Sequence, residues 1–580
     1  MAHGYMSSRG ALEAEDVGND ISRPINHGEQ NSRSTSPKDE RQKCISQQNP
    51  PDASWTGINE LSSAVGNLKH LRHLNLSGTE IRSLPDSLCS LWNLHVLNLD
   101  DCEKLEVLPK KMRYLINLRH LFLENCDALR EMPSKIRELT RLQTLSAFIV
   151  GRDRGQGLEE LQWLKLGGNL KIHHLDRVKD PIDAKKANLG KKENLRRLFL
   201  DWGSNAEYLV RSWEEGIEMD EKLLEALEPH PNLETLLIRG FKGRCFPVWM
   251  SNSTLDKLVE IILLRCHNCL HLPQLGELPH LKKLILTHME NLEYILEEAA
   301  VVRSGNSLLS PSQPFPSLET LDLRYSPNIR GLIKEQVTMG SVKAFPNLEV
   351  LYVEGCSSLI LPPLSTSFKK LKILYCGILL LASVPKADLL NLTKLFVNLE
   401  ENTVGTCTLT LETLQSFTNL KSLGIYNAAG ELSLPEQGLQ HLTALEELYV
   451  FECPQLVELP EEIKHIPRLK TVTLQNLPKM ACLPESLKHL SSSFHCLELV
   501  NLHQLSSLPD WFGDMTSLEE LYIDECPKLA SFPTSIRRMT NLRYLTVKKC
   551  PELERRCERA NGEDWHKIQH VRHLLIGEQL

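Results

Sequence analysis

A six-residue pattern, Leu-x-x-Leu-x-Leu, recurs along this 580-residue chain. It is clear at Leu71, Leu94 and Leu118, and it is still present at Leu542. The first leucines of the three early copies lie 23 and 24 residues apart. The apolar fourth and sixth residues alternate with polar ones, as on a short strand that buries one face. Copies this short cannot each build a core, so they must stack and bury their apolar sides against one another.

The spacing lies within the period of roughly 20–29 residues that is typical of leucine-rich repeats. We therefore predict an α/β leucine-rich-repeat solenoid, a horseshoe with a parallel concave β-sheet and about twenty turns. Pairs such as Leu84-Pro85 and Leu508-Pro509 follow the predicted strands and end them, because proline cannot donate to a sheet ladder. Stacked turns also explain how the chain exceeds the roughly 250–300 residues of a single core.

The regularity of the repeats divides the chain. Residues 21–57 are predicted to be a disordered linker, because residues 26–52 are rich in Asn, Gln, Ser, Pro and charge. Regular N-terminal repeats are expected over 58–146. Irregular repeats with inserts are expected over 147–317, and C-terminal repeats with a cap over 318–580.

Composition excludes several classes of protein. The net charge of −8 gives no general attraction to nucleic acid. No run of about 18 apolar residues predicts a membrane span. The first residues lack a signal-peptide pattern, so a cytoplasmic protein with reduced thiols is expected.

Eight of the sixteen cysteines stand three residues after the last strand leucine. This is the Asn/Cys position of the repeat, where a small buried side chain meets backbone groups of the turn, and a structural role is therefore predicted. The eight are Cys102, Cys126, Cys266, Cys356, Cys376, Cys453, Cys526 and Cys550. Cys266 and Cys269 have the spacing that begins a zinc site, but no second pair follows, so a metal is the weaker alternative.

Motifs for catalysis are absent from the sequence. It contains no phosphate loop, no His-Glu-x-x-His and no Gly-x-Ser-x-Gly. We therefore expect no enzyme activity, no catalytic or metal-binding residues and no cofactor.

The third, fifth and seventh residues of each copy should face the concave side. Aromatic residues gather there in the later repeats, and aromatic side chains are preferred interface anchors. The predicted partner-binding residues are Tyr352, Phe396, Tyr426, Glu447, Tyr449, Phe451, Glu520 and Tyr522. The early third positions are basic and form a separate predicted set: His73, His120, Arg197 and Lys283. A basic-to-acidic gradient along the face suggests two different partners at its two ends.

A purely structural interpretation of these side chains stays open. Charges at the second position, Glu446 beside Lys470 and Glu519 near Arg543, would pair across adjacent strands for a few tenths of a kcal/mol. On this interpretation the aromatic residues shield neighbouring strands and bind no partner.

Several blocks resemble one family. They include Val65 to Leu88, Leu145-Ser146-Ala147-Phe148-Ile149-Val150-Gly151, Leu272-Pro273-Gln274-Leu275-Gly276, and Gly562-Glu563-Asp564-Trp565-His566-Lys567-Ile568. In their order they resemble the leucine-rich-repeat region of plant coiled-coil-type nucleotide-binding leucine-rich-repeat (NLR) disease resistance proteins, over residues 58–580. Residues 1–20 resemble a remnant of the family's winged-helix segment. Most of the nucleotide-binding module, with its phosphate loop, is missing from the sequence.

The resemblance implies a non-enzymatic recognition module in plant innate immunity. Its expected partners are a pathogen effector or a guarded host protein, and the nucleotide-binding module of an NLR in cis or in trans, which it would help to keep inactive. No nucleic acid and no membrane span are expected. The alternatives are a leucine-rich-repeat adaptor or scaffold, and a truncated NLR fragment that does not signal.

Overall fold

The chain divides into two units, Met1–Pro51 and Asp52–Leu580, and the structure concerns the second. The computed structural model describes residues 57–203, 213–250, 253–296, 314–334, 345–356, 358–361, 370–374, 389–390, 392–398, 415, 417–426, 439–457, 459, 461–490, 492–559 and 561–577. The predicted winged-helix remnant (1–20) and the predicted linker (21–57, except Gly57) lie outside the described residues, as does Cys376.

Short strands recur along the described chain, one in nearly every repeat. They are β1 (His73–Asn75), β2 (Val96–Asn98), β3 (His120–Phe122), β4 (Thr144–Leu145), β5 (Ala147–Ile149), β6 (Gly168–His173), β7 (Leu195–Asp201), β8 (Thr235–Arg239), β9 (Glu260–Leu264), β10 (Lys283–Thr287), β11 (Tyr294–Leu296), β12 (Thr320–Arg324), β13 (Gly331–Ile333), β14 (Val350–Glu354), β15 (Lys370–Leu374), β16 (Lys394–Asn398), β17 (Ser422–Tyr426), β18 (Glu447–Phe451), β19 (Thr471–Gln475), β20 (Cys496–Val500), β21 (Glu520–Asp524), β22 (Tyr544–Lys548) and β23 (His573–Ile576).

All of the strand pairings are parallel. Strands β1 to β4 form one sheet, and a second sheet runs in sequence order from β5 to β23, without β11 and β13, which pair with each other. The second sheet is open, because no pairing between described residues joins β23 to β5. Counting β4 and β5 as one turn and leaving out β11 and β13, the described strands make twenty turns. The predicted leucine-rich-repeat solenoid is confirmed.

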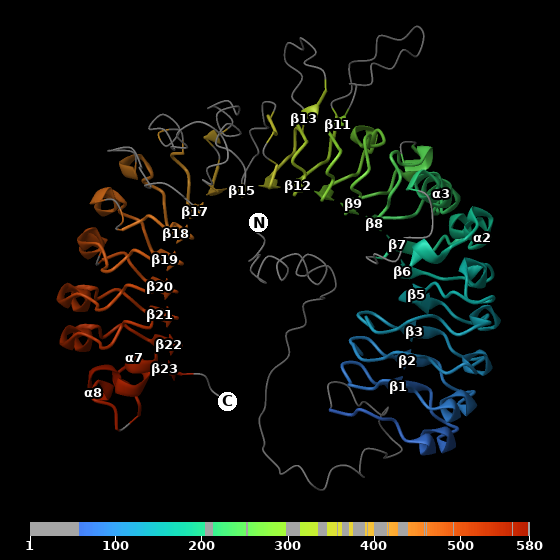
Figure 1. Ribbon diagram of the computed structural model, residues 1–580, viewed down its shortest axis with the longest axis horizontal. Coiled ribbons are helices and arrows are strands. Elements are labelled where there is room, and N and C mark those ends of the chain that lie inside the picture. Colours follow the sequence, from blue (N-terminus) through green and yellow to red (C-terminus); the bar gives the residue numbers. More distant parts are fainter. Residues whose placement is uncertain are drawn as a thin grey trace. The chain divides into compact units, whose positions relative to one another are not determined.

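Helices make the other side of the stack (Figure 1). Most are single 3₁₀ turns: η2 (Ser63–Asn67), η3 (Asp86–Ser90), η4 (Met112–Tyr114), η5 (Ile136–Glu138), η6 (Leu158–Leu161), η7 (Leu175–Arg177), η8 (Leu189–Lys191), η9 (Val248–Met250), η10 (Ser253–Leu255), η11 (Leu275–Glu277), η12 (Leu439–His441), η13 (Glu461–His465), η14 (Glu485–Leu490), η15 (Asp510–Asp514) and η16 (Thr534–Arg538). The α-helices among the described residues are α2 (Pro181–Lys186), α3 (Trp213–Ala226), α7 (Pro551–Arg556) and α8 (Trp565–Ile568). No helix in the described part is long and apolar enough to span a membrane.

The repeat leucines fill the space between the two sides. Leu97 and Leu99, on and just after β2, are fully buried on the strand side, and so are Leu88 and Leu91 on the helix side of the first turn. The described cysteines of the Asn/Cys position are also buried. The Cys102 thiol donates to the carbonyl of Leu76 in the preceding turn, at 3.1 Å. The predicted structural role of this position therefore agrees with its burial and its backbone contacts.

The eighth position of the repeat is left-handed in many turns. Positive φ angles occur there at Gly78, Asp101, Asn125, Gly240, Arg265, His288, Tyr325, Gly355, Glu452, Asn476, Asn501, Glu525 and Lys549. A left-handed residue with a side chain costs about 1–2 kcal/mol. Side chains of successive turns meet at this position. Asn125 donates to Asp101 at 2.8 Å, and the Lys549 ammonium lies 2.7 Å from Glu525, so neighbouring turns offset part of the cost.

The two sheets separate at Ser146, where the chain bends out of strand geometry for one residue. The Ser146 hydroxyl accepts the buried amide of Leu123 at 2.6 Å, in place of a ladder carbonyl. Its own carbonyl accepts the amide of Lys171 in the next turn, at 2.9 Å. Hydrogen bonding therefore continues across the division.

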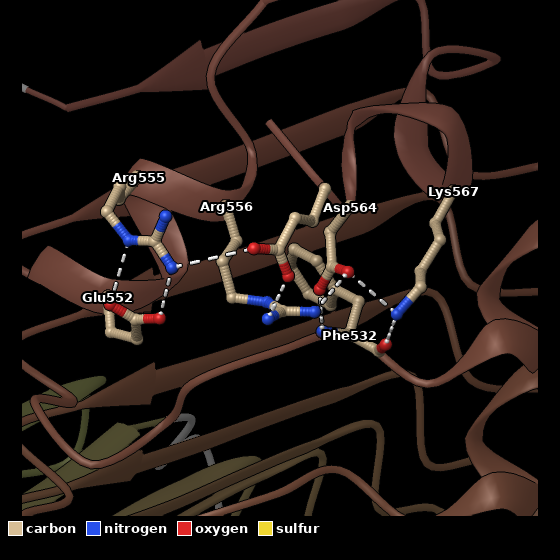
Figure 2. A network of polar contacts seen from close by, with 7 residues as sticks. Phe532, Glu552, Arg555, Arg556, Asp564 and Lys567 are labelled. Carbon is tan, nitrogen blue, oxygen red and sulfur yellow. Dashed lines mark hydrogen bonds and ion pairs between the residues drawn. The ribbon is translucent and has the colours of Figure 1, made fainter. Parts of the chain in front are cut away.

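A polar cluster closes the C-terminal end of the stack (Figure 2). The Asp564 carboxylate, 1% exposed, accepts the amide of Phe532 at 3.0 Å and lies between Arg556 (3.0 Å) and Lys567 (2.8 Å). Gly562 has no room for a side chain, because a Cβ would lie 2.2 Å from the Arg556 carbonyl oxygen. This cluster ties α7 and α8 to the turn before β22.

Candidate functional site

The third, fifth and seventh positions of the strands form the strand face, the side predicted to be concave. Strand register places the fifth positions in one column across adjacent turns. From β8 to β22 the column contains Leu237, Ile262, Ile285, Asp322, Tyr352, Lys372, Phe396, Gly424, Tyr449, Thr473, Glu498, Tyr522 and Thr546.

Four aromatic side chains gather on β16, β17 and β18. We call Phe396, Tyr426, Tyr449 and Phe451 the aromatic patch. The Phe396 ring lies 5.6 Å from Tyr449 and 6.2 Å from Tyr426, and Phe451 stacks on Tyr426 at 4.8 Å. All four side chains are partly exposed and stand outside the leucine core. Ring pairs at these separations hold each other in place, so the patch presents a preformed apolar surface.

A missing side chain makes the patch possible. Gly424 stands between Phe396 and Tyr449 in the fifth-position column. A Cβ at Gly424 would lie 2.1 Å from Cδ1 of Phe396. The Phe396 ring therefore occupies the space above the glycine and reaches Tyr449 across it.

Glu447 borders the patch and connects three polar groups. The Tyr449 hydroxyl donates to its Oε2 at 3.3 Å, the Ser422 hydroxyl donates to the same oxygen, and Lys394 lies 3.6 Å away. Burial and, next, the Glu447 charge raise the pKa of Tyr449 to about 12. Tyr449 therefore stays protonated and is oriented by Glu447.

Tyr352 lies in a different cluster, whose polar groups bond to one another. The Arg324 guanidinium stacks 4.0 Å from the Tyr352 ring and donates twice to Asp322, at 2.8 and 2.9 Å. The Tyr352 hydroxyl donates to Glu354 at 3.1 Å, and Tyr325 donates to the same carboxylate. These contacts fix Tyr352 within the sheet.

The late residues Glu520 and Tyr522 lie on β21, three strands from β18. The Tyr522 hydroxyl donates to Asp524 at 3.3 Å, and Thr473 donates to Glu498 at 2.9 Å. Glu498, Glu520 and Asp524 stand on neighbouring strands at this end of the strand face.

The early end carries carboxylates beside its basic side chains, and the basic-to-acidic gradient stays a prediction. Lys283 pairs with Glu260 at 2.9 Å, and seventh positions add the carboxylates of Asp100, Glu124 and Asp201. The prediction used third positions alone, whereas acids of the seventh column share the same face. Burial raises the pKa of Asp100 to about 6.

Other early side chains are partly engaged. His120 contacts the Thr144 hydroxyl at 3.1 Å, while His73 and Arg197 are exposed. Ile262 and Ile285 are only 1% and 2% exposed, although their fifth positions belong to the strand face and not to the leucine core. Neighbouring strands lie about 4.8 Å apart, so each aliphatic side chain in a column is covered by its neighbours on the strands beside it.

The structure thus brings Phe396, Tyr426, Tyr449 and Phe451 together beside Glu447, and it does not bring Tyr352, Glu520 or Tyr522 to them. The sequence analysis did not identify Gly424, Ser422 and Lys394, because the Leu-x-x-Leu-x-Leu pattern does not specify the residues at the x positions. Their alignment with Phe396 and Tyr449 was a signal that could have identified them.

Among the described residues, no three His, Cys, Asp or Glu side chains are arranged to hold a metal ion. Burial raises the pKa of the Cys266 thiol to about 12.

Family models match three parts of the chain. Residues 70–91 match "Leucine Rich Repeat", residues 158–289 match "R13L1/DRL21 LRRs", and residues 391–551 match "Plant disease resistance protein RPS2-like, leucine-rich repeats". The repeats of residues 391–551 are thus similar to those of plant disease resistance proteins. The predicted resemblance to the repeat region of plant NLR proteins is therefore confirmed.

Curated relatives agree with this assignment. The chain is 40% identical over 352 residues to disease resistance protein RGA2 of Solanum bulbocastanum, covering 60% of this chain and 34% of that protein. It is 33% identical over 436 residues to putative disease resistance protein RGA4 of the same species, covering 75% and 37%. A putative disease resistance RPP13-like protein 1 of Arabidopsis thaliana is 37% identical, covering 70% and 38%. The chain spans about a third of the length of these relatives.

A leucine-rich-repeat protein of Leptospira interrogans is similar among solved structures. The identity is 20%, the TM-score is 0.33, and 86% of this chain and 90% of that one are covered.

Proposed function

We propose that this chain is a non-enzymatic recognition module of plant innate immunity, which senses a pathogen effector or a guarded host protein through its strand face. The aromatic patch is the observation that carries the proposal. Its four rings come from three adjacent strands, contribute nothing to the leucine core, and remain partly exposed. Aromatic side chains held rigidly in this way are the usual anchors of protein interfaces.

The patch gives the recognition site a centre on β16–β18. Tyr449 offers its ring together with a hydroxyl already oriented by Glu447, so a partner meets little loss of side-chain freedom there. Tyr352, Glu520 and Tyr522 would extend the contact in both directions along the sheet. Tyr352 contributes least, because Arg324 and Glu354 already hold it.

A second part of the proposal concerns autoinhibition in the cytoplasm. The early residues His73, His120, Arg197 and Lys283 would contact the nucleotide-binding module of an NLR, in cis or in trans. This part depends on the type of repeat that the chain shares with its relatives. His73 and Arg197 are its main candidates, since Lys283 is paired with Glu260.

The test joins the chain to the nucleotide-binding module of a disease resistance relative and expresses the chimera in leaves with a panel of pathogen effectors. For an effector that triggers cell death, we expect Tyr449→Ala combined with Phe451→Ala to abolish the response. Val457→Ala is the matched control, because Val457 follows β18 in the same turn and is 58% exposed outside the strand face. Tyr522→Ala shows whether the contact reaches β21.

Two results count against the proposal. An unchanged response with Tyr449 and Phe451 both replaced would remove the patch as the recognition site. A chimera whose patch binds a partner without any cell-death response would favour an adaptor or a non-signalling fragment. Circular dichroism of each variant checks that the repeats remain folded.

A further inference from the structure

The first five turns share an edge that the proposed function does not use. Because their strands are parallel, the segments that lead into the strands lie side by side. We call residues 67–72, 90–95, 114–119, 138–143 and 161–167 the leading edge. Hydrogen bonds connect its turns in series: the Asn117 amide group donates to the Trp92 carbonyl at 2.7 Å, and the Gly167 amide donates to Gln143 at 2.8 Å.

Positive charge is concentrated on the leading edge without matching acids. Its cations are Lys69, Arg72, Arg119, Arg141 and Lys165, and Glu138 is its one acidic residue. In the part of the chain that the structure describes, none of the five cations forms an ion pair within 4 Å. On the opposite edge, by contrast, Arg82 and Arg130 both pair with Glu106. The positive field of the leading edge is therefore uncompensated.

Three of these cations surround a hollow. Arg119, Arg141 and Lys165, together with Thr140 and Gln143, line a cavity of about 290 Å³ that is open to solvent. Slight burial and then the charges of Arg119 and Arg72 lower the pKa of nearby His95. Cations that line one hollow beside neutral donors can bind a phosphate.

Large apolar side chains protrude from the same edge. Trp92 is 53% exposed, Tyr114 51%, Ile116 57% and Trp163 66%. The Lys69 ammonium lies 5.6 Å from the Trp92 ring. In sequence these apolar side chains alternate with the cations along the leading edge.

We propose that the leading edge docks on an anionic membrane surface, with a lipid phosphate in the hollow of Arg119, Arg141 and Lys165, and with Trp92, Ile116 and Trp163 in the interfacial layer. Tryptophan is enriched at membrane interfaces, and clusters of Lys and Arg are attracted to anionic lipids. An anionic membrane surface can receive both kinds of side chain, the cations at its phosphates and the exposed Trp and Ile side chains in its interfacial layer. This site is independent of the aromatic patch.

The test uses the full chain and vesicles of phosphatidylcholine, with or without phosphatidylserine or a phosphoinositide. We expect sedimentation with the anionic vesicles only, and quenching of tryptophan fluorescence when brominated lipids are included. Arg141→Gln combined with Lys165→Gln should weaken binding roughly 25-fold, since each cation near an anionic surface contributes on the order of a fivefold change. Lys104→Gln combined with Lys110→Gln, on the opposite edge, is the charge-matched control and should bind as the unmodified chain does.

Each contrary outcome overturns the proposal. Equal binding to neutral vesicles, or equal weakening by the control pair, would show that these cations do not recognise the lipid. Binding of inositol hexakisphosphate without any vesicle binding would leave a phosphate site with no membrane role. Binding of polyglutamate with no vesicle binding would favour an acidic protein. Thermal unfolding of every variant checks that lost binding is not lost folding.

Discussion

Replacing Asp564 by Asn should open the C-terminal end of the stack. The carboxylate is 1% exposed and serves three donors: Arg556, Lys567 and the amide of Phe532. Asparagine keeps the shape but loses the charge, and it turns an NH₂ group toward cationic donors. Breaking a buried ion pair from one side costs about 3–5 kcal/mol. Arg556 is 25% exposed, so water will screen part of this, and we expect about 3 kcal/mol.

The loss should be local, because each turn of a solenoid contacts only its neighbours. Hydrogen exchange followed by mass spectrometry should therefore show roughly a hundredfold faster exchange in β22, β23 and α7. Strands β18 to β20 should exchange at the original rate. Glu563→Gln is the matched control, because Glu563 also pairs with Arg556 but is 59% exposed. Equal protection in the Asp564 and Glu563 variants would refute the reasoning, and so would faster exchange along the whole sheet.

The Asp564 carboxylate also predicts that the C-terminal end of the stack loses stability at low pH. Burial tends to raise the pKa of Asp564, but the hydrogen bonds from Arg556 and Lys567 outweigh it and lower the pKa below its ordinary value. A carboxylate with a lowered pKa stabilises the fold above its unfolded pKa of about 4, and this contribution is lost as pH falls through the folded value. The end of the stack should therefore open below about pH 4 in the unmodified chain, and Asp564→Asn should lack this transition.

Three further changes test single features of the structure. Burial lowers the pKa of Lys192 to about 8, so above that pH Lys192 is neutral in the folded chain but still protonated in the unfolded chain. The stability advantage of the unmodified chain over Lys192→Met should therefore grow from pH 8 to pH 10 in thermal unfolding. Gly424→Ala should displace the Phe396 ring, changing the near-ultraviolet circular dichroism at a cost of about 1–3 kcal/mol, whereas an unchanged spectrum would show that the ring does not depend on the glycine. Ser146→Ala should cost about 1–3 kcal/mol in urea unfolding by leaving a buried amide unpaired, while Ser535→Ala, which removes a buried hydroxyl without a partner, should cost little.

The periodicity predicted the parts of the fold that repeat. The alternation of apolar residues identified the strands and the strand-face columns, and the predicted pairs Glu446–Lys470 (2.8 Å) and Glu519–Arg543 (3.4 Å) are confirmed. These pairs follow from a constant spacing between adjacent turns.

Features that depend on neighbours across unequal turns could not be predicted. Tyr352 lies beside Asp322 in the register although 30 residues separate them in sequence, so its capture by Arg324 was not visible from the pattern. The aromatic patch needed the identity of three adjacent fifth positions at once, with Gly424 in the middle. The left-handed eighth position is occupied by residues as different as Gly240 and Tyr325, so no residue type marks it.

The division at Ser146 has a consequence for changes in the length of the chain. Turns on either side interact only with adjacent turns, so duplicating or deleting a whole turn within either sheet would leave the other turns' ladders intact. The Ser146 hydroxyl, however, completes the ladder of the first sheet while its carbonyl starts that of the second. Whole turns can therefore be exchanged within each sheet but not across Ser146. A graft that joins repeats from two proteins should keep this serine together with the turns of Leu123 and Lys171, to which it is hydrogen-bonded.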